Sequence, residues 1–353
     1  MGSNLLIALA SIALQSPQTD SAPASLTHGL GFERLQDLLQ YNRVQGLSFG
    51  LGYRVSFFGA PGVALYQTVR YGLSDDRVTG RITILRDAPG ARLAVSGYGD
   101  IADLDPYSPG RTWANTFNGL FAGHDNGDYS FAQGGSASVE APLAPGLDLV
   151  VAASLERQTS LRAVAQSELN DFLGGTGVFP SNPPVEEGTF GFASVGLNRV
   201  GATRWNLAVD LLGGAGQATA RVYGDATKSM GSGLGASLRL KAGAATTPAL
   251  PQSFFRLGGL STVRGFEYAT LREPAFWAAQ VDITLFEARI RPVVFLDAGQ
   301  AGSVGGLLSQ RALVGGGIGL SLFSGLLRFD VSRPVSPDHK GKARFDLVLQ
   351  GVR

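Results

Sequence analysis

The sequence predicts an all-β fold, a transmembrane antiparallel β-barrel, and three observations lead to this prediction. First, about fifteen segments of roughly ten residues alternate apolar with polar side chains, which is the pattern of strands with one apolar face. Second, the connections between these segments alternate between short and long, as in membrane barrels. Third, 49 of the 353 residues are Gly and only 16% are charged. A tilted strand spans a bilayer with about 9–11 residues, whereas a helix needs about 20 consecutive apolar ones.

The expected strands follow one another along most of the chain. Leu207, Val209 and Leu211, for example, share one face of their segment, and Asp210 lies on the other. Because backbone inside a bilayer must satisfy its own hydrogen bonds, the strands must close into a barrel. Closure favours an even number of antiparallel strands, so we expect roughly 16, with one between 100 and 128 and with the first and last strands paired. The ranges expected from alternation are 43–57, 62–73, 77–87, 91–99, 129–141, 146–158, 187–199, 203–213, 217–228, 232–246, 274–286, 289–298, 312–323, 325–334 and 342–352.

The connections favour a membrane barrel over other β folds. Short turns such as 87–90 and 144–146 contain Gly and Pro, whereas 100–128, 159–186 and 247–273 are long and polar. A soluble β-sandwich rarely has so many strands, and a propeller shows a blade repeat that this sequence lacks.

The composition excludes several classes of function. Lys and Arg number 29 and Asp and Glu number 28, so a net charge of +1 leaves no broad basic surface for nucleic acid. A chain without Cys has no disulfide, no thiolate metal site and no Cys nucleophile. The three histidines, His28, His124 and His339, are too few for a multi-His metal site. We therefore expect no catalytic residue, no metal and no cofactor, and a protein that is not an enzyme.

Two short motifs have a structural explanation that we prefer to a chemical one. Gly46–Gly50 matches the Gly-x-Ser-x-Gly spacing of a nucleophile elbow, but Ser48 falls in the middle of a predicted strand instead of at a strand-to-helix turn. The run 124–128 offers Asp125 and Asp128 to calcium, but it lacks the closing Glu of a calcium-binding loop. We expect the first to be ordinary strand and the second to be a solvated loop.

Residues 1–25 are expected to form a signal peptide or a disordered leader. Leu5–Leu14 is an apolar run too short for a spanning helix, and small and polar residues follow it in 15–25. The run lacks the preceding Lys or Arg of an ordinary signal peptide, which leaves a truncated gene start as the alternative. The barrel domain is then expected over 26–353.

A cluster in the last long connection carries a resemblance to a known family. It lies in the predicted loop at about 250–273, directly after Leu257–Gly259 and ahead of the last predicted strands. Its four residues are Val263, Arg264, Gly265 and Phe266. This tetrad closely resembles the lid-loop signature of BamA/TamA-type outer-membrane barrels, which belong to the bacterial surface antigen superfamily.

Further matches support the same resemblance. Val294–Gly299 resembles the Phe-x-Asp-x-Gly strand of this family, and Gly317–Pro334 resembles its penultimate hairpin. Tyr41–Gly46 is similar to the opening of barrel domains in bacterial members of the wider group. The resemblance is strong over 250–353 and moderate over 41–160.

The resemblance implies a lid loop that folds back into the lumen, where Arg264 pairs with a carboxylate on the Phe-x-Asp-x-Gly strand. Asp297 lies on the polar face of that strand, opposite Leu296, and is the first choice of partner; Asp330, on the polar face of a later strand, is the second. An unpaired buried charge is very costly, so an Arg in the lumen needs such a partner. Gly265 lets the backbone approach the wall closely. The alternative is an ordinary Gly turn in an external loop.

The resemblance also implies a protein of the bacterial outer membrane that takes part in membrane-protein insertion, protein translocation or lipid handling, or that anchors a partner. Its partners are then the lipid bilayer and unfolded outer-membrane or secreted proteins, and no nucleic acid. The predicted barrel begins near Tyr41, which leaves no room for POTRA domains, so we expect a separately encoded periplasmic partner. The alternatives are a passive channel or structural barrel with a plugged lumen, and a hydrolase. A hydrolase is disfavoured because no His is expected in the middle of a strand.

Overall fold

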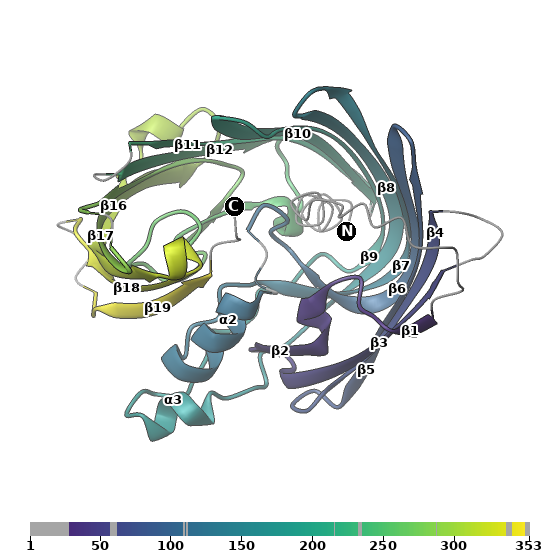
Figure 1. Ribbon diagram of the computed structural model, residues 1–353, viewed down its shortest axis with the longest axis horizontal. Helices are drawn as coiled ribbons and strands as arrows, with labels where there is room; N and C mark the ends of the chain where they lie inside the picture. Colours follow the sequence, from purple (N-terminus) through teal and green to yellow (C-terminus); the bar gives the residue numbers. More distant parts are fainter. Residues whose placement is uncertain are drawn as a thin grey trace.

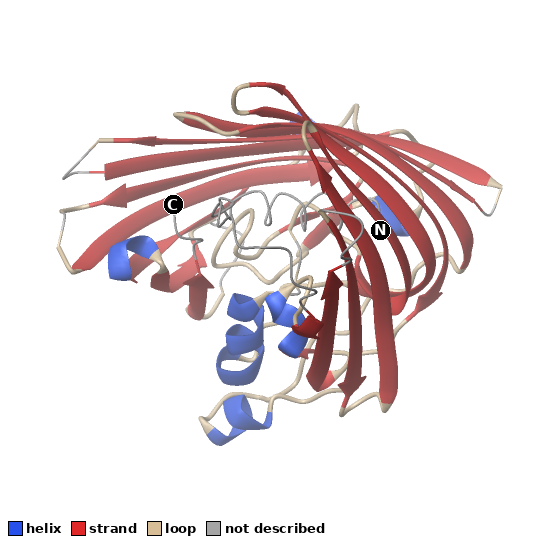
Figure 2. Ribbon diagram, turned by 45° about the vertical axis from the view of Figure 1, so that its right-hand side comes forward, coloured by secondary structure: helices blue, strands red, loops and turns tan. Residues whose placement is uncertain are grey.

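The fold is given by a computed structural model, which describes residues 28–56, 62–108, 110, 112–214, 216–231, 235–286, 288–336 and 341–349. The expected leader at 1–25 and His339 lie outside the described residues. The chain forms one curved antiparallel sheet of 17 strands and a separate two-stranded hairpin. Figures 1 and 2 show the sheet curling around an interior that contains loops.

The long strands form a wall, and their positions agree closely with the alternating segments of the sequence. Those of the first half are β3 (Gly46–Ser56), β4 (Val63–Gly72), β5 (Arg77–Ala88), β6 (Ala91–Asp103), β7 (Tyr129–Ala144), β8 (Leu147–Ser160) and β9 (Gly188–Arg199). Those of the second half are β10 (Thr203–Gly214), β11 (Gln217–Met230), β12 (Gly235–Ala245), β15 (Ala275–Thr284), β16 (Ile290–Gly302), β17 (Leu313–Leu322), β18 (Leu327–Pro334) and β19 (Arg344–Leu349).

Each long strand pairs antiparallel with the next one in the chain, from β3 to β12 and from β15 to β19. After β12 the chain leaves the wall for the connection 246–274, which contains the hairpin of β13 (Phe255–Leu257) and β14 (Leu271–Glu273). It returns as β15 beside β12. The sheet therefore runs up and down without a crossover, which confirms the all-β antiparallel prediction.

The side chains of the wall have the reverse of the burial that a water-soluble protein shows. In β5, the apolar Val78 and Ile82 are 64% and 48% exposed, whereas Thr79 and Arg81 are buried on the opposite face. An apolar exterior and a polar interior are the arrangement of a membrane barrel. Exposed apolar side chains of other strands include Leu51, Val69, Val95, Leu155, Leu207, Val209, Leu211, Leu296, Ile318 and Val331.

Short turns join the strands at one end of the wall, and three long connections, 104–128, 161–187 and 246–274, lie together at the other end. The helices are short, and in the described part of the chain none is long and apolar enough to cross a membrane. They are α2 (Trp113–Phe117), the π-helix η2 (Asn118–Ala122) and α3 (Glu168–Phe172). Single 3₁₀ turns occur at η1 (Leu35–Leu38), η3 (Pro251–Ser253), η4 (Leu307–Ser309) and η5 (Phe323–Gly325).

The two edges of the wall differ from the prediction. The strands β1 (His28–Leu30) and β2 (Leu39–Asn42) pair with β3 on the edge that faces away from β4. At the other edge β19 pairs with β18. Figure 1 shows α2 in the space between β19 and β2. The expected pairing of the first and last strands is therefore not found among the described residues.

The strand expected between 100 and 128 is wrong, because this segment forms α2 and η2 instead. The side chain of Thr112 accepts a hydrogen bond from the backbone N–H of Asn115, which is a normal start of a helix. Phe117 and Phe121 then share one face at helical spacing. The sheet has 17 strands because the short β1 and β2, which pair with β3, join the 15 long strands.

Candidate functional site

The connection 246–274 folds back into the interior of the curved sheet, and there Arg264 meets β16. The Arg264 Nε donates to Oδ2 of Asp297 at 2.7 Å, and its Nη2 donates to Oδ1 at 2.6 Å. The backbone N–H of Arg264 also donates to Oδ2 of Asp297, at 2.9 Å. Arg264 is 6% exposed and Asp297 is 1% exposed. A bidentate guanidinium–carboxylate pair of this kind fixes geometry as well as adding energy.

Two more carboxylates and a second guanidinium surround this pair. The Nη2 of Arg264 lies 2.8 Å from Asp282, and its Nη1 lies 3.4 Å from Asp330. Arg328, from β18, donates to Asp330 at 2.6 Å and to Asp282 at 3.2 Å. We call this group the lid lock, and its members are Arg264, Arg328, Asp282, Asp297 and Asp330.

The nominated partners, Asp297 and Asp330, both lie within reach of Arg264, but sequence reasoning missed Asp282 and Arg328. The alternation of polar and apolar residues, applied to the neighbouring strands, could have identified both. Asp282 alternates with two exposed apolar residues of β15, and Arg328 is two residues before Asp330 on the same face of β18. A buried cation inside a barrel can pair with carboxylates from every strand that it faces, so the polar faces of β15 and β18 had to be considered together with that of β16.

The ring of Phe295 completes the environment of both guanidiniums. The Cζ of Arg264 lies 3.8 Å from its centroid, and that of Arg328 lies 5.1 Å away. Burial by itself lowers the pKa of Arg264, but the hydrogen bonds and charge of Asp297 raise that pKa above its ordinary value. The lid lock therefore holds a permanently charged Arg264 in a largely dry setting.

Two glycines allow the lid backbone to lie against the wall. Gly265 has a φ of +91°, and a Cβ on it would meet the backbone of Arg333 at 2.5 Å. In β17, a Cβ on Gly315 would collide with the carbonyl oxygen of Arg264. Side chains at either position would push the lid away from the lid lock, because the collisions are with backbone atoms.

The other two residues of the tetrad anchor the lid through apolar packing. Val263 is fully buried and Phe266 is 4% exposed. Both belong to a buried cluster that joins the lid to the inner wall. The remaining members of the cluster are Tyr223, Ala245, Phe255, Leu257, Phe276, Ala278, Ala301 and Leu313. The tetrad thus combines one charged contact with two apolar ones.

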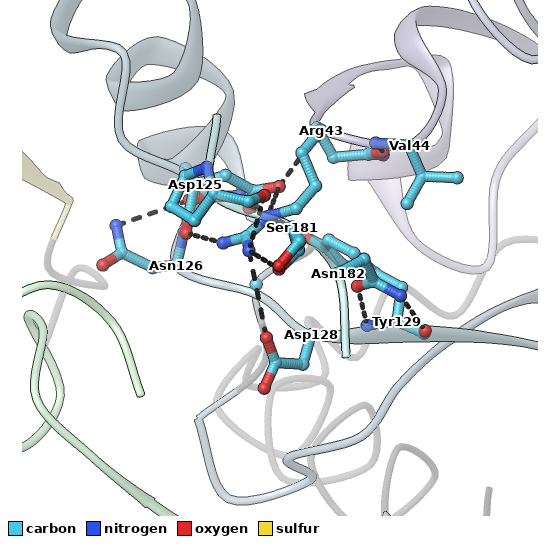
Figure 3. Close-up of polar contacts among 12 residues, drawn as sticks. Arg43, Val44, Asp125, Asn126, Asp128, Tyr129, Ser181 and Asn182 are labelled. Carbon is cyan, nitrogen blue, oxygen red and sulfur yellow. Dashed lines mark hydrogen bonds and ion pairs between the residues drawn. The ribbon is translucent and has the colours of Figure 1, made fainter. Parts of the chain in front are cut away.

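A second buried charge cluster ties together the loops at the end with long connections (Figure 3). Arg43, in the turn between β2 and β3, donates from Nε to Asp125 at 3.2 Å and from Nη2 to the Asp125 carbonyl at 2.5 Å. Its Nη1 donates to the carbonyls of Pro180 and Ser181 in the second long connection. Arg43 thus joins the start of the wall to two long loops.

The lid joins the same cluster through Asp128, which is fully buried. Its carboxylate accepts from Nε of Arg256 at 3.0 Å and from Nε and Nη2 of Arg272 at 2.9 and 3.0 Å. The Nη1 of Arg43 lies 4.0 Å away. Burial by itself raises the pKa of Asp128, but the three guanidiniums hold this pKa below its ordinary value. We call Arg43, Asp125, Asp128, Arg256 and Arg272 the cap knot.

The cap knot corrects the expectation of a solvated loop at 124–128, because Asp125 and Asp128 are buried and paired with arginines. No local pattern marks these arginines as partners, because they lie in the turn after β2 and in the connection 246–274. The neighbouring motif at Tyr41–Gly46 has a local explanation. The Oδ1 of Asn42 accepts hydrogen bonds from the backbone N–H groups of Val44 and Gln45, at 3.0 and 2.8 Å. Gly46 then has a φ of +60°. This tight turn aims Arg43 into the cap knot.

Ser48 and His124, which the sequence motifs singled out, lie in the wall or in contact with it. Ser48 is fully buried within β3. The Nδ1 of His124 lies 3.3 Å from Asp346 of β19. Within the described ranges, no group of three or more His, Cys, Asp or Glu is placed to hold a metal ion.

Comparisons with known proteins agree with this architecture. A family model described as the C-terminal domain of a family of unknown function (DUF5686) matches residues 23–207, which is more than half of the chain. No curated protein matches the chain.

Three solved structures are similar in fold at low sequence identity. The chain resembles BamA from Haemophilus ducreyi lacking POTRA domains 1–3, with a TM-score of 0.61, 12% identity, and coverage of 97% of this chain and 77% of that one. It resembles CdiB from Acinetobacter baumannii with a TM-score of 0.51, 15% identity, and coverage of 88% and 57%. For CdiB from Escherichia coli the TM-score is 0.50 at 13% identity, with coverage of 98% and 70%. The chain therefore has the fold of outer-membrane β-barrels of the BamA and CdiB kind.

Proposed function

The chain belongs to the DUF5686 family of unknown function, through that family's C-terminal domain, and from the fold that it shares with BamA and CdiB barrels we propose that it inserts or translocates proteins at the bacterial outer membrane. In this proposal the curved sheet is a barrel in the bilayer, and unfolded outer-membrane or secreted proteins are its substrates. It acts with a separately encoded periplasmic partner, needs no cofactor and is not an enzyme.

The observation that carries the proposal is the contrast between a lid bound inside the sheet and two sheet edges whose strands do not pair with each other in the described residues. The lid is held to the wall by the bonds of Arg264 to Asp297 and to the other long loops by Asp128. At the same time, β19 does not pair with β2 or β3 in the described ranges. This combination favours a route through the side of the wall over a route along its axis.

An assisted-folding assay tests the proposal. The purified chain is reconstituted in vesicles of phosphatidylethanolamine and phosphatidylglycerol, and a small outer-membrane barrel unfolded in urea is added as the probe. Folding of the probe is followed by its shifted mobility on an unheated gel. We expect faster folding than in empty vesicles, and no acceleration by a heat-denatured sample of the same chain.

Planar-bilayer conductance of the same preparation separates the proposal from a passive channel. A lid held in the interior by Arg264 predicts low conductance that rises in Arg264→Ala. Arg289→Ala, at an exposed arginine in a short turn, should leave the conductance unchanged. A high conductance in the unmodified chain together with no effect on probe folding would replace the proposal by the passive-channel alternative. Low conductance with no effect on folding would favour a structural barrel with a plugged lumen.

A further inference from the structure

The space between the two sheet edges is occupied by residues 113–122, which we call the seam insert. It consists of α2 and η2 in direct succession. Its buried side chains, Asn115, Thr116 and Asn118, point toward the protein, and the exposed Phe117 and Phe121 lie on another face.

On one side the seam insert takes the place of a strand beside β19. The side chain of Asn118 donates from Nδ2 to the carbonyl of Leu347 at 2.9 Å, and its Oδ1 accepts from the Leu347 N–H at 2.6 Å. An antiparallel strand would make the same pair of bonds to one residue. Asn118 is 1% exposed, so these bonds are shielded from solvent. The carboxamide therefore satisfies backbone groups that an open sheet edge would leave unpaired.

On the other side the seam insert contacts β2. The backbone N–H of Tyr41 donates to the Thr116 hydroxyl at 3.1 Å. The Tyr41 ring packs so closely on Gly119 that a Cβ there would lie 2.9 Å from it. The Tyr41 hydroxyl donates to the carbonyl of Gln166, just ahead of α3. The seam insert thus bridges the two edges that the strands leave apart.

The outer faces of the seam insert and α3 form one apolar patch, and the Nδ2 of Asn170 links the two helices by donating to the carbonyl of Phe121 at 3.1 Å. Phe172 is 85% exposed, and the rest of the patch is exposed by two-fifths or more. The members of this seam patch are Phe117, Phe121, Leu169, Phe172 and Leu173. A cluster of exposed aromatic and aliphatic side chains of this kind marks an interaction site.

The strand β19, which the seam insert contacts, and β3, which lies beside β2, also have exposed apolar side chains. Phe345 of β19 is 50% exposed, and Phe49 of β3 is 46% exposed. The exposed Glu168 and Asp171 of α3 lie one residue before Leu169 and Phe172, so charged side chains stand beside the apolar ones. The N–H groups of Asp171 and Leu173 donate to the carbonyls of Ser167 and Leu169, so part of the backbone of α3 is satisfied within the helix.

We propose that the seam insert is part of the membrane wall and that the seam patch binds the acyl chains of the bilayer. This inference rests on the proposed location of the barrel in a membrane. At the seam, lipid then meets a helical segment latched to β19 by Asn118 in place of a closed pair of strands.

Spin labels on single cysteines test the inference, because the chain has no native Cys. Phe121→Cys and Phe172→Cys are labelled with a nitroxide in phosphatidylethanolamine and phosphatidylglycerol vesicles, and their collision with oxygen and with a water-soluble nickel chelate is measured. Leu155→Cys, outward on β8, is the reference for lipid, and Lys342→Cys, at an exposed charged residue just ahead of β19, is the reference for water. Asp171→Cys is the matched control at an exposed charged residue of α3.

The inference predicts a high oxygen-to-nickel accessibility ratio at positions 121 and 172, similar to that at 155, and a low ratio at 171 and 342. A low ratio at 121 and 172 would overturn it, because the patch would then face water. Low accessibility to both reagents, with dipolar broadening between labelled chains, would also overturn it and assign the patch to a second copy. If Leu155→Cys itself gave the aqueous ratio, the proposed membrane location would fail instead.

Discussion

The side chain of Asn118 makes both hydrogen bonds to the backbone of Leu347 that a neighbouring strand would make, although the two residues are 229 positions apart. Asn182 bonds the N–H and C=O of Tyr129 in the same two-way manner at the first residue of β7, at 2.8 and 2.7 Å. Side-chain amides thus complete strand backbone at two places where the wall has no strand to offer.

Replacing Asn118 by Ala is expected to loosen β19. The change leaves a buried N–H and a buried C=O of Leu347 without partners, and each unsatisfied group costs about 1–3 kcal/mol. Hydrogen exchange at the amides of 344–349 should accelerate, and the temperature at which the folded gel form is lost should fall. Gln217→Ala, which removes an exposed amide at the end of β11, is the control and should change neither quantity. Unchanged exchange in Asn118→Ala would mean that the latch carries no stability.

The bond between Arg264 and Asp297 is expected to keep the lid in the interior. Breaking a buried ion pair by removing one partner costs about 3–5 kcal/mol. Arg264→Ala should therefore raise protease sensitivity around 253–273, while the strand bonds keep the wall folded. Asp297→Ala should behave similarly.

The double variant supplies the control for this pair. Because the two side chains act through one interaction, Arg264→Ala with Asp297→Ala should cost clearly less than the sum of the single changes. Additive costs would mean that the two side chains do not interact, and the lid lock would have to be abandoned.

The alternation of apolar and polar residues was sufficient to predict the wall. It placed the long strands within a few residues of their observed bounds, because each strand has an apolar outer face and a polar inner face. The resulting period of two depends only on local sequence. The same parity placed Asp297 on the inner face and Leu296 on the outer one.

Features that depend on distant partners escaped prediction. The helix at 113–122 interrupts a region where Gly and polar residues gave no clear period, and its role depends on contacts with β2 and β19. The burial of Asp125 and Asp128 depends on Arg43 in the turn after β2 and on Arg256 and Arg272 in the lid hairpin, two distant parts of the chain. No local pattern marks a carboxylate whose counterions are supplied by folding.

The close approach of the lid to β17 is expected to tolerate no side chain at Gly315. Its Cβ would strike the carbonyl oxygen of Arg264, so Gly315→Ala must displace the lid or the strand. Overpacking of this kind costs about 1–3 kcal/mol. We expect raised protease sensitivity at 253–273 and raised conductance.

Gly97→Ala in β6 is the matched control for Gly315→Ala, because a Cβ at Gly97 meets nothing within 4 Å. It should leave lid cleavage and conductance at the levels of the unmodified chain. If both variants behaved alike, the effect would come from β propensity instead of the contact with the lid.

The cap knot is expected to weaken in acid through Asp128. The three guanidiniums hold the pKa of Asp128 in the folded chain below its ordinary value, although burial alone would raise it. A depressed folded pKa means that the carboxylate contributes its full stabilisation above the unfolded value of about 3.9 and loses it as the pH falls through the folded pKa. Protonated Asp128 then leaves Arg256 and Arg272 without their common partner.

Hydrogen exchange of the lid amides at 250–273 measures this loss, after correction for intrinsic rates, at about pH 7 and about pH 3, on either side of the ordinary Asp pKa. We expect lower protection of the lid at the acid pH. Asp128→Asn should lower protection already at neutral pH and reduce the difference between the two conditions, because the titrating group is gone. Asp171→Asn, an exposed carboxyl on α3, should keep the full difference. A full acid effect in Asp128→Asn would mean that Asp128 is not the group whose titration weakens the lid.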